Sequence, residues 1–213
     1  MDILLLTKFL AFIFMLAITP GPDIICVLTE STTRGKLRGF VLALGLASGV
    51  SVHTLLCATG LALVINNSPT AILVLKIMGS LYLAWLAIEA FREKPTMRAI
   101  GDNDCCDDRA KIKSLPALYA QGFVMNVVNP KVILFFLGIL PAFVTSTASF
   151  SITIQYFVLG LMFMLTTIVV FGAVSVLGGS LRPLLAKAGF WRAERWVRVI
   201  LFASLAIFIA AGL

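Results

Sequence analysis

The sequence predicts an all-α integral membrane protein with six transmembrane helices. Hydrophobic residues make up 60% of the 213 residues and charged residues only 13%, about half the share of roughly 25% found in soluble proteins. The mean hydropathy is +1.04. This length accommodates six spans of about 20 residues with short connections, so we expect a single transmembrane domain over residues 1–213.

The first half, about residues 1–92, contains three expected helices. The first is interrupted by Thr-Pro-Gly-Pro-Asp at 19–23, because two prolines and a glycine cannot continue an α-helix. The second helix carries no Lys, Arg, Asp or Glu and ends at the turn sequence Asn66–Pro69. The three helices are expected at about Ile3–Leu28, from Gly39 to that turn, and at Thr70–Phe91.

The second half, about residues 115–213, repeats this plan after a polar loop at about 93–114. Its first helix is interrupted at Asn129-Pro130, where an N-capping residue again precedes a proline. The three helices are expected at about Leu115–Leu140, Ile152–Leu177 and Val199–Leu213.

Basic residues predict the orientation. The loops after the first, third and fifth helices hold three, six and five Lys and Arg residues, and the other two connections hold none. Lys and Arg accumulate in cytoplasmic loops, so both termini are expected outside. Each half contains three helices, so the second half is expected to run inverted relative to the first.

The two interrupted helices occupy matching positions of the inverted halves, which is the best sequence indication of a secondary-transporter binding site. We expect Thr19 and Asn129 to cap the second half-helices, whose free N–H groups suit a substrate carboxylate. Counted along the helices, the two breaks are expected about 10 Å apart along the membrane normal.

Ionisable and polar residues near the breaks are candidate site residues. Asp23 either stabilises a helix N-terminus or carries a proton or a substrate ammonium group. Lys131 either pairs with Asp23, neutralises a substrate carboxylate or extends to the membrane interface. Asn126 and Asn129 lie three residues apart on one helical face, where we expect Asn129 to cap and Asn126 to contact substrate.

Two further residues are weaker candidates. His53, at the end of Gly45-x-x-x-Gly49-x-x-x-His53, is either a packed residue or a proton relay. Tyr82 lies three residues before Trp85 and either lines a cavity or packs between helices. The glycine-rich helix faces also permit a homodimer.

Other classes of function are disfavoured. The net charge of +7 does not predict nucleic-acid binding, because the basic residues flank hydrophobic segments. The four cysteines show no C-x-x-C spacing and only one histidine is present, so we expect reduced cysteines, no metal and no cofactor. A membrane redox or hydrolytic enzyme lacks its catalytic set, which leaves a transporter or a passive channel for small solutes.

These motifs resemble the LysE/RhtB family of bacterial amino-acid exporters. The resemblance covers nearly the whole chain and rests on Thr-Pro-Gly-Pro-Asp at 19–23, on Gly79-x-x-Tyr82-Leu83 and on the block Gly122–Val144, which contains Asn-Pro-Lys. It implies a multi-pass protein of the bacterial inner membrane that exports amino acids or close derivatives by proton-driven antiport. It also implies site roles for Pro20, Gly21, Pro22, Asn126, Asn129, Pro130 and Lys131.

Overall fold

The computed structural model describes residues 3–19, 21–61, 69–92, 112–145, 150–185 and 188–211, and over these residues the chain is helical without strands. The loop expected at 93–114, with the acidic stretch 102–108, lies almost entirely outside them. The elements are α1 (Ile3–Ile18), α2 (Pro22–Arg34), α3 (Lys36–Leu56), η1 (Cys57–Leu61), α5 (Pro69–Arg92), α6 (Leu115–Val127), α7 (Pro130–Leu134), η3 (Phe135–Ile139), η4 (Leu140–Phe143), α8 (Ile152–Leu185) and α9 (Ala188–Ala211).

Both predicted helix interruptions are confirmed. The helices α1 and α2 meet at a bend of 59°, and α6 meets the segment Pro130–Phe143 at a bend of 45°. Within the described residues, two helical segments, Lys36–Gly60 and Ile152–Gly178, are long and apolar enough to cross a membrane. Each bent pair also qualifies if it forms one span, which raises the number of candidates to four.

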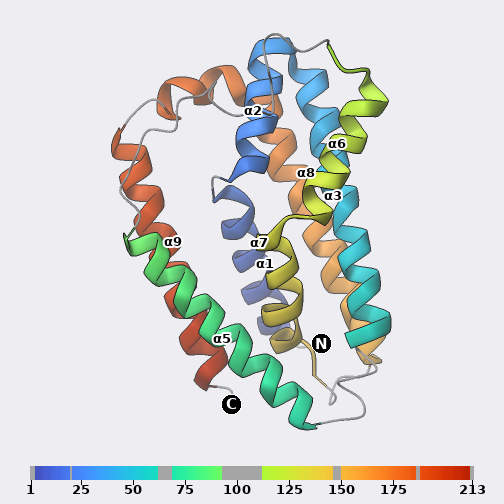
Figure 1. The fold of residues 1–213 in the computed structure, drawn as a ribbon, viewed down its shortest axis with the longest axis vertical. Helices are drawn as coiled ribbons and strands as arrows, with labels where there is room; N and C mark the ends of the chain where they lie inside the picture. Colours follow the sequence, from blue (N-terminus) through green and yellow to red (C-terminus); the bar gives the residue numbers. More distant parts are fainter. Residues whose placement is uncertain are drawn as a thin grey trace.

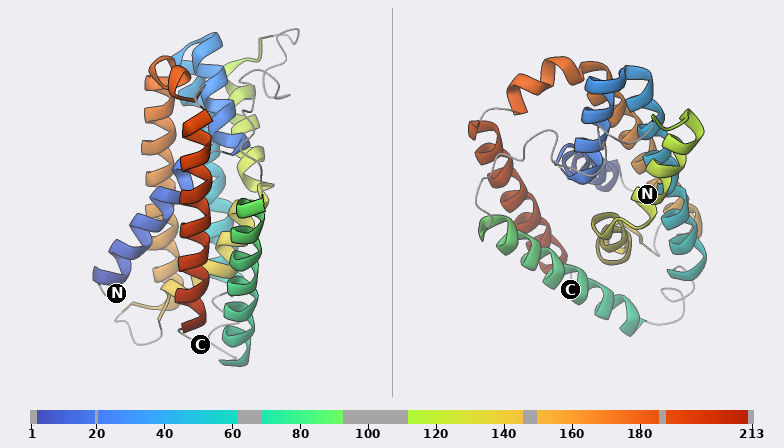
Figure 2. Two further views of the ribbon diagram at one scale, coloured as in Figure 1. Left: turned by 90° about the vertical axis from the view of Figure 1, so that its left-hand side faces the viewer. Right: turned by 45° about the horizontal axis from the view of Figure 1, so that its top comes forward.

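The segments α1 and α7, one from each broken helix, lie between two groups of helices (Figures 1 and 2). The pair α5 and α9 stands on one side, and α3, α6 and α8 stand on the other (Figures 1 and 2). The segments α1–α2 and α6–α7 run in opposite directions along the bundle (Figure 1). Both termini lie at one end, and the turn between α2 and α3, which carries Arg34 and Lys36, lies at the other.

The last helix begins earlier than predicted. It starts at Ala188 rather than at Val199 and is 24 residues long. The basic residues of its first half did not mark a loop, because Trp196 packs edge-to-face against Phe91 of α5, with ring centroids 6.0 Å apart. Packing of α9 along α5, which includes this contact between two exposed rings, outweighs the local charge and extends the helix. The fifth helix, α8, likewise extends beyond Leu177 to Leu185.

An aromatic cluster around Phe135 packs the segment after the second break against α1 and α8. Phe135 of η3 stacks on Phe12 of α1 with centroids 5.5 Å apart, and it also contacts Phe9 and Phe163. Because Phe9 is fully buried and Phe135 is 1% exposed, these contacts hold α1, η3 and α8 together. Offset and edge-to-face aromatic pairs each add about 0.5–1.5 kcal/mol beyond their buried area.

Glycines allow α3 and α6 to touch through their backbones. A methyl group added at Gly45 would overlap the carbonyl oxygen of Tyr119, and one added at Gly122 would overlap that of Leu42. Small residues at such crossings permit close approach of membrane helices. The Gly45/Gly49 pattern therefore packs α3 against α6 within one chain and positions the end of α6 where the second break begins.

Substitution of Gly45 tests this contact. We expect Gly45→Ala to lower the melting temperature of the purified protein, since overpacking a close contact costs about 1–3 kcal/mol. Gly60→Ala is the matched control, because a methyl group there meets no atom within 4 Å. Equal thermal unfolding of the two variants in detergent would contradict the close packing of α3 on α6.

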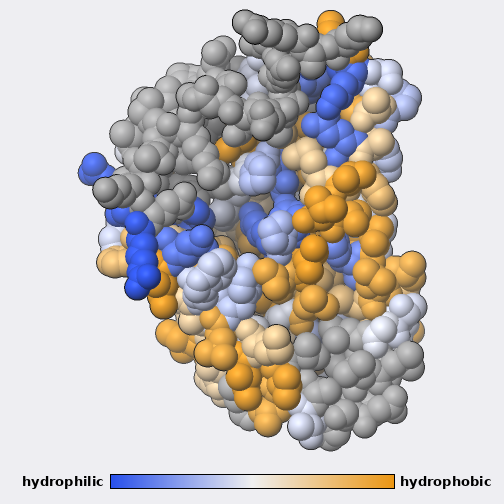
Figure 3. Space-filling view, viewed as in Figure 1, coloured by the Kyte–Doolittle hydropathy of each residue, from blue (hydrophilic) through white to orange (hydrophobic). Residues whose placement is uncertain are grey.

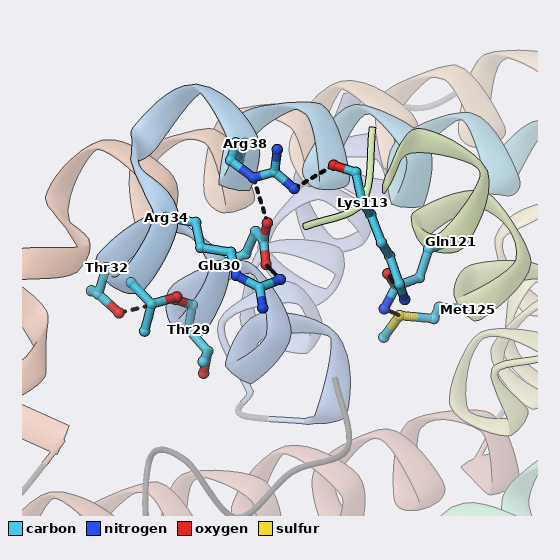
Figure 4. A network of polar contacts seen from close by, with 9 residues as sticks. Thr29, Glu30, Thr32, Arg34, Arg38, Lys113, Gln121 and Met125 are labelled. Carbon is cyan, nitrogen blue, oxygen red and sulfur yellow. Dashed lines mark hydrogen bonds and ion pairs between the residues drawn. The ribbon is translucent and has the colours of Figure 1, made fainter. Parts of the chain in front are cut away.

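A charged network joins the two halves at the end opposite the termini (Figure 4). The Glu30 carboxylate of α2 accepts from Arg38 Nε at 2.7 Å and from Arg34 Nη1 at 3.5 Å. Arg38 also donates to the carbonyl oxygen of Lys113 at 2.7 Å, and Lys113 Nζ donates to Gln121 of α6 at 2.8 Å. The Glu30 side chain is only 2% exposed, so its charge depends on these partners.

A double-mutant cycle measures the interaction free energy between Glu30 and Arg38. Glu30→Ala should lower the free energy of unfolding by about 3–5 kcal/mol, because it leaves the neighbouring guanidinium groups without their buried counter-charge. Adding Arg38→Ala should cost less in the Glu30→Ala background than in the wild type, by about 0.5–3 kcal/mol. Strictly additive losses in the four proteins would show that Glu30 and Arg38 do not interact.

Candidate functional site

The first break ends α1 at Ile18 and restarts the chain at α2. Pro22 occupies the first turn of α2, and the cap is Gly21, which has extended backbone angles and no side chain to accept from the helix N–H groups. The prediction that Thr19 caps α2 is therefore wrong. Its hydroxyl instead donates to the carbonyl oxygen of Met15 at 2.8 Å, because Pro22 as the first helical residue leaves the capping position to Gly21.

The second break has the cap that the first one lacks. Asn129 precedes Pro130, and its side-chain oxygen accepts from the backbone N–H of Lys131 at 3.0 Å. The predicted capping role of Asn129 and the position of Pro130 at the start of a helix are thus confirmed. The Asn129 side chain still has its amide nitrogen free to donate elsewhere.

The two breaks meet directly. Asn129 Nδ2 donates to Asp23 Oδ2 at 2.5 Å, and both side chains are buried, with Asp23 8% and Asn129 7% exposed. The expected separation of about 10 Å along the bundle is therefore wrong. Counting residues along straight helices ignores the bends of 59° and 45°, which bring the starts of α2 and α7 together.

Lys131 crosses from the second break to the first. Its ammonium group donates to the carbonyl oxygen of Leu16 at 2.7 Å and lies 3.4 Å from that of Thr19. It also interacts electrostatically with the Asp23 carboxylate. Of the three alternatives for Lys131, the structure therefore places it among groups inside the bundle, with an acid and an amide beside it.

Asn126 and His53 form a second layer next to the break. His53 Nε2 lies 3.4 Å from the backbone oxygen of Asn126, and the imidazole packs on Phe136 with centroids 5.4 Å apart. The Asn126 side chain, 2% exposed, lies so close to Gly49 that a methyl group there would overlap it. Its Oδ1 has no hydrogen-bond partner within the described residues.

Other predicted site residues lie apart from this cluster or outside the described chain. Tyr82 is half-buried on α5 and stacks on Trp85 of the same helix with ring centroids 5.7 Å apart, so its role stays a prediction. Pro20 lies outside the described residues. In the same view as Figure 1, hydrophilic residues gather in a recess at mid-height between hydrophobic surfaces (Figure 3).

The described residues include possible metal ligands and two of the four cysteines, Cys26 and Cys57. Among the described residues, no group of three or more His, Cys, Asp or Glu side chains is arranged to hold a metal ion. Cys57 is a free, buried thiol, but Cys26 is disulfide-bonded. The expectation that all four cysteines are reduced is therefore wrong for Cys26.

The acceptors of Lys131 were missed by the sequence reasoning. They are main-chain oxygens of Leu16 and Thr19, and no side-chain pattern marks a carbonyl. The available signal was the proline pair itself, because a helix that stops inside a membrane leaves its last carbonyls unpaired. Lys131, on the partner break, reaches them.

The sequence of this chain is similar to those of bacterial efflux proteins. A homoserine/homoserine lactone efflux protein of Salmonella typhimurium is 32% identical over 157 residues, which is 73% of this chain and 69% of the relative. A leucine efflux protein of Klebsiella pneumoniae is 27% identical over 156 residues, 73% of this chain and 70% of the relative.

Two membrane proteins, of Synechocystis sp. and Bacillus subtilis, are 29% and 30% identical, each over 61% of this chain. The chain spans 60% and 63% of their lengths. No solved structure matches the chain.

The family described as LysE type translocator matches residues 14–212, almost the whole chain. This match covers both breaks, the cluster around Asp23 and Lys131, and α3, α5, α8 and α9. It confirms the resemblance seen in the motifs and agrees with the expectation of a transporter rather than an enzyme. The chain belongs to the family of LysE type translocators.

Proposed function

We propose that this protein is a secondary transporter that exports amino acids or close derivatives from the cytoplasm in exchange for protons. In this proposal six transmembrane helices form two inverted three-helix repeats in the bacterial inner membrane. Both termini face the periplasm, and the charged network of Glu30 and Arg38 faces the cytoplasm. The pair α1–α2 and the pair of α6 with Pro130–Phe143 each form one broken span.

One observation carries the proposal: a buried acid, a buried amide and a half-buried ammonium group meet where the two breaks come together. Asp23, Asn129 and Lys131 come from opposite halves of the chain and contact each other or the opposing helix end. Ionisable residues at such a depth are costly unless they serve a pathway or are paired. Broken helices at matching positions of two repeats hold substrate sites in secondary transporters.

The cluster has the groups that a zwitterion needs. The α2 N-terminus has no side-chain cap, and a methyl group added at Gly21 would meet no atom within 4 Å. A substrate carboxylate can therefore approach the free N–H groups of the first α2 turn. Asp23 in that turn receives the ammonium group or the exchanged proton. The named activities of the two efflux relatives, toward homoserine and leucine, support an amino-acid substrate.

Reconstituted protein tests the proposal. We would measure counterflow of each labelled amino acid in preloaded proteoliposomes to identify the substrate. We would then measure its accumulation in proteoliposomes that have an imposed pH gradient and no preloaded amino acid, with and without an uncoupler. Accumulation against a gradient that an uncoupler abolishes supports proton-coupled export. Flux that only runs downhill and survives the uncoupler would instead establish a passive channel, and no amino-acid flux at all would refute the proposal.

Asp23→Asn is the most informative variant. It keeps a side chain that can accept from Asn129 but cannot hold a proton or a full negative charge. We expect export to be lost while the protein still inserts and purifies as the wild type does. Export at the wild-type rate by this variant would remove Asp23 from the mechanism. Glu89→Gln on α5 is the control, because it makes the same change at an exposed carboxylate.

Substitution at Gly21 tests carboxylate binding at the α2 N-terminus. Gly21→Ser supplies a hydroxyl that can accept from the helix N–H groups, whereas Gly21→Ala adds similar bulk without a cap. A serine cap is worth about 1 kcal/mol over alanine, so the serine variant should be the more stable. Since its hydroxyl competes with the substrate carboxylate, its KM should be about fivefold higher than that of the alanine variant. Equal KM values would place the carboxylate elsewhere.

A further inference from the structure

The carbonyl end of α1 is an unusual feature inside this bundle. The last four carbonyl oxygens of a helix lack helical partners and carry a partial negative charge of roughly half a unit. The backbone N–H and the hydroxyl of Thr19 both serve one of them, the Met15 oxygen. The next carbonyl, that of Leu16, accepts from Lys131, which is 115 residues away in the chain.

Two carbonyl oxygens therefore accept from one ammonium group, and one carboxylate charge acts on it. Lys131 Nζ is 2.7 Å from the Leu16 oxygen and 3.4 Å from the Thr19 oxygen, and its charge interacts with the Asp23 carboxylate. A primary ammonium group has three N–H donors and one positive charge; the two carbonyl oxygens accept from it, and the Asp23 carboxylate acts on its charge. Nothing in the set depends on the carbon chain of lysine.

The α-ammonium group of an amino acid offers the same three donors and the same charge. It would be recognised by the same oxygens if Lys131 moved aside, and the lysine stem is flexible enough to do so. The substrate carboxylate would then supply a partner for the displaced lysine. No charge would be left unpaired in either arrangement, which matters because an unpaired buried charge costs several kcal/mol.

We propose that the carbonyl end of α1 together with Asp23 is the binding site for the substrate's ammonium group, and that Lys131 occupies it whenever substrate is absent. Lys131 is thus a tethered competitor that leaves the site on substrate binding and pairs with the substrate carboxylate. This inference rests on the proposed transport of amino acids. It also explains how an empty carrier keeps Asp23 paired without taking up a metal cation.

A cavity variant with a free cation tests the site. Lys131→Ala removes three carbons and the ammonium group, which n-propylammonium replaces. We expect n-propylammonium chloride to raise the melting temperature of purified Lys131→Ala saturably. Tetramethylammonium, which has the charge but no N–H donor, should bind at least tenfold more weakly. Wild-type protein should not respond to n-propylammonium, because its own lysine fills the site.

An equal response of Lys131→Ala to the two cations, or an equal response of wild type and variant to n-propylammonium, would overturn the inference. This measurement needs no substrate, so it is independent of the counterflow assay. If wild-type protein transports no amino acid, the proposed function fails, whereas the cation response still decides whether α1 ends in an ammonium site.

A second measurement covers the case in which Lys131→Ala does not fold. Wild-type counterflow of a transported amino acid would be challenged with the same amino acid bearing a trimethylated nitrogen. The trimethyl group retains the charge and cannot donate hydrogen bonds to the Leu16 and Thr19 oxygens. We expect it to compete at least tenfold more weakly than the parent amino acid, and equal competition would overturn the inference.

Discussion

The hydrogen bond between Asn129 and Asp23 is the contact on which the arrangement of this protein depends. Each helix break exposes backbone groups that hydrocarbon cannot satisfy, and each unsatisfied group costs several kcal/mol there. A break is therefore stable only when another part of the protein covers it. Here each break covers the other, since Asn129 reaches Asp23 and Lys131 reaches the end of α1.

The remaining packing keeps the two breaks in register. Backbone contact at Gly45 and Gly122 fixes α6 against α3 and so places the second break beside the first. Stacking of Phe135 on Phe12 fixes the segment beyond the second break against α1. The Glu30 network ties α2 to α3 and α6 at the opposite end from the termini. The polar cluster at the breaks is thus flanked by the Glu30 network on one side and by the Phe12–Phe135 stack on the other.

Sequence alone predicted the features that depend on local chemistry. Proline at 22 and 130 enforces the breaks, and Asn129 before Pro130 is a strong capping sequence. Features set by geometry between distant segments were not predictable in the same way. The depth of the breaks depended on their bend angles, the start of α9 depended on Trp196 meeting Phe91, and the acceptors of Lys131 are carbonyls that no residue type reveals.

The polar groups at the breaks must be considered as one unit. Asn129 uses its oxygen to cap α7 and its nitrogen to bind Asp23, while the charge of Asp23 also acts on Lys131. Loss of any one member leaves buried groups of the others without partners, which costs more than the lost bond itself. Single substitutions here therefore report on the whole cluster. Only variants that preserve shape and hydrogen bonding while changing charge, or that are combined in pairs, separate the contribution of each residue.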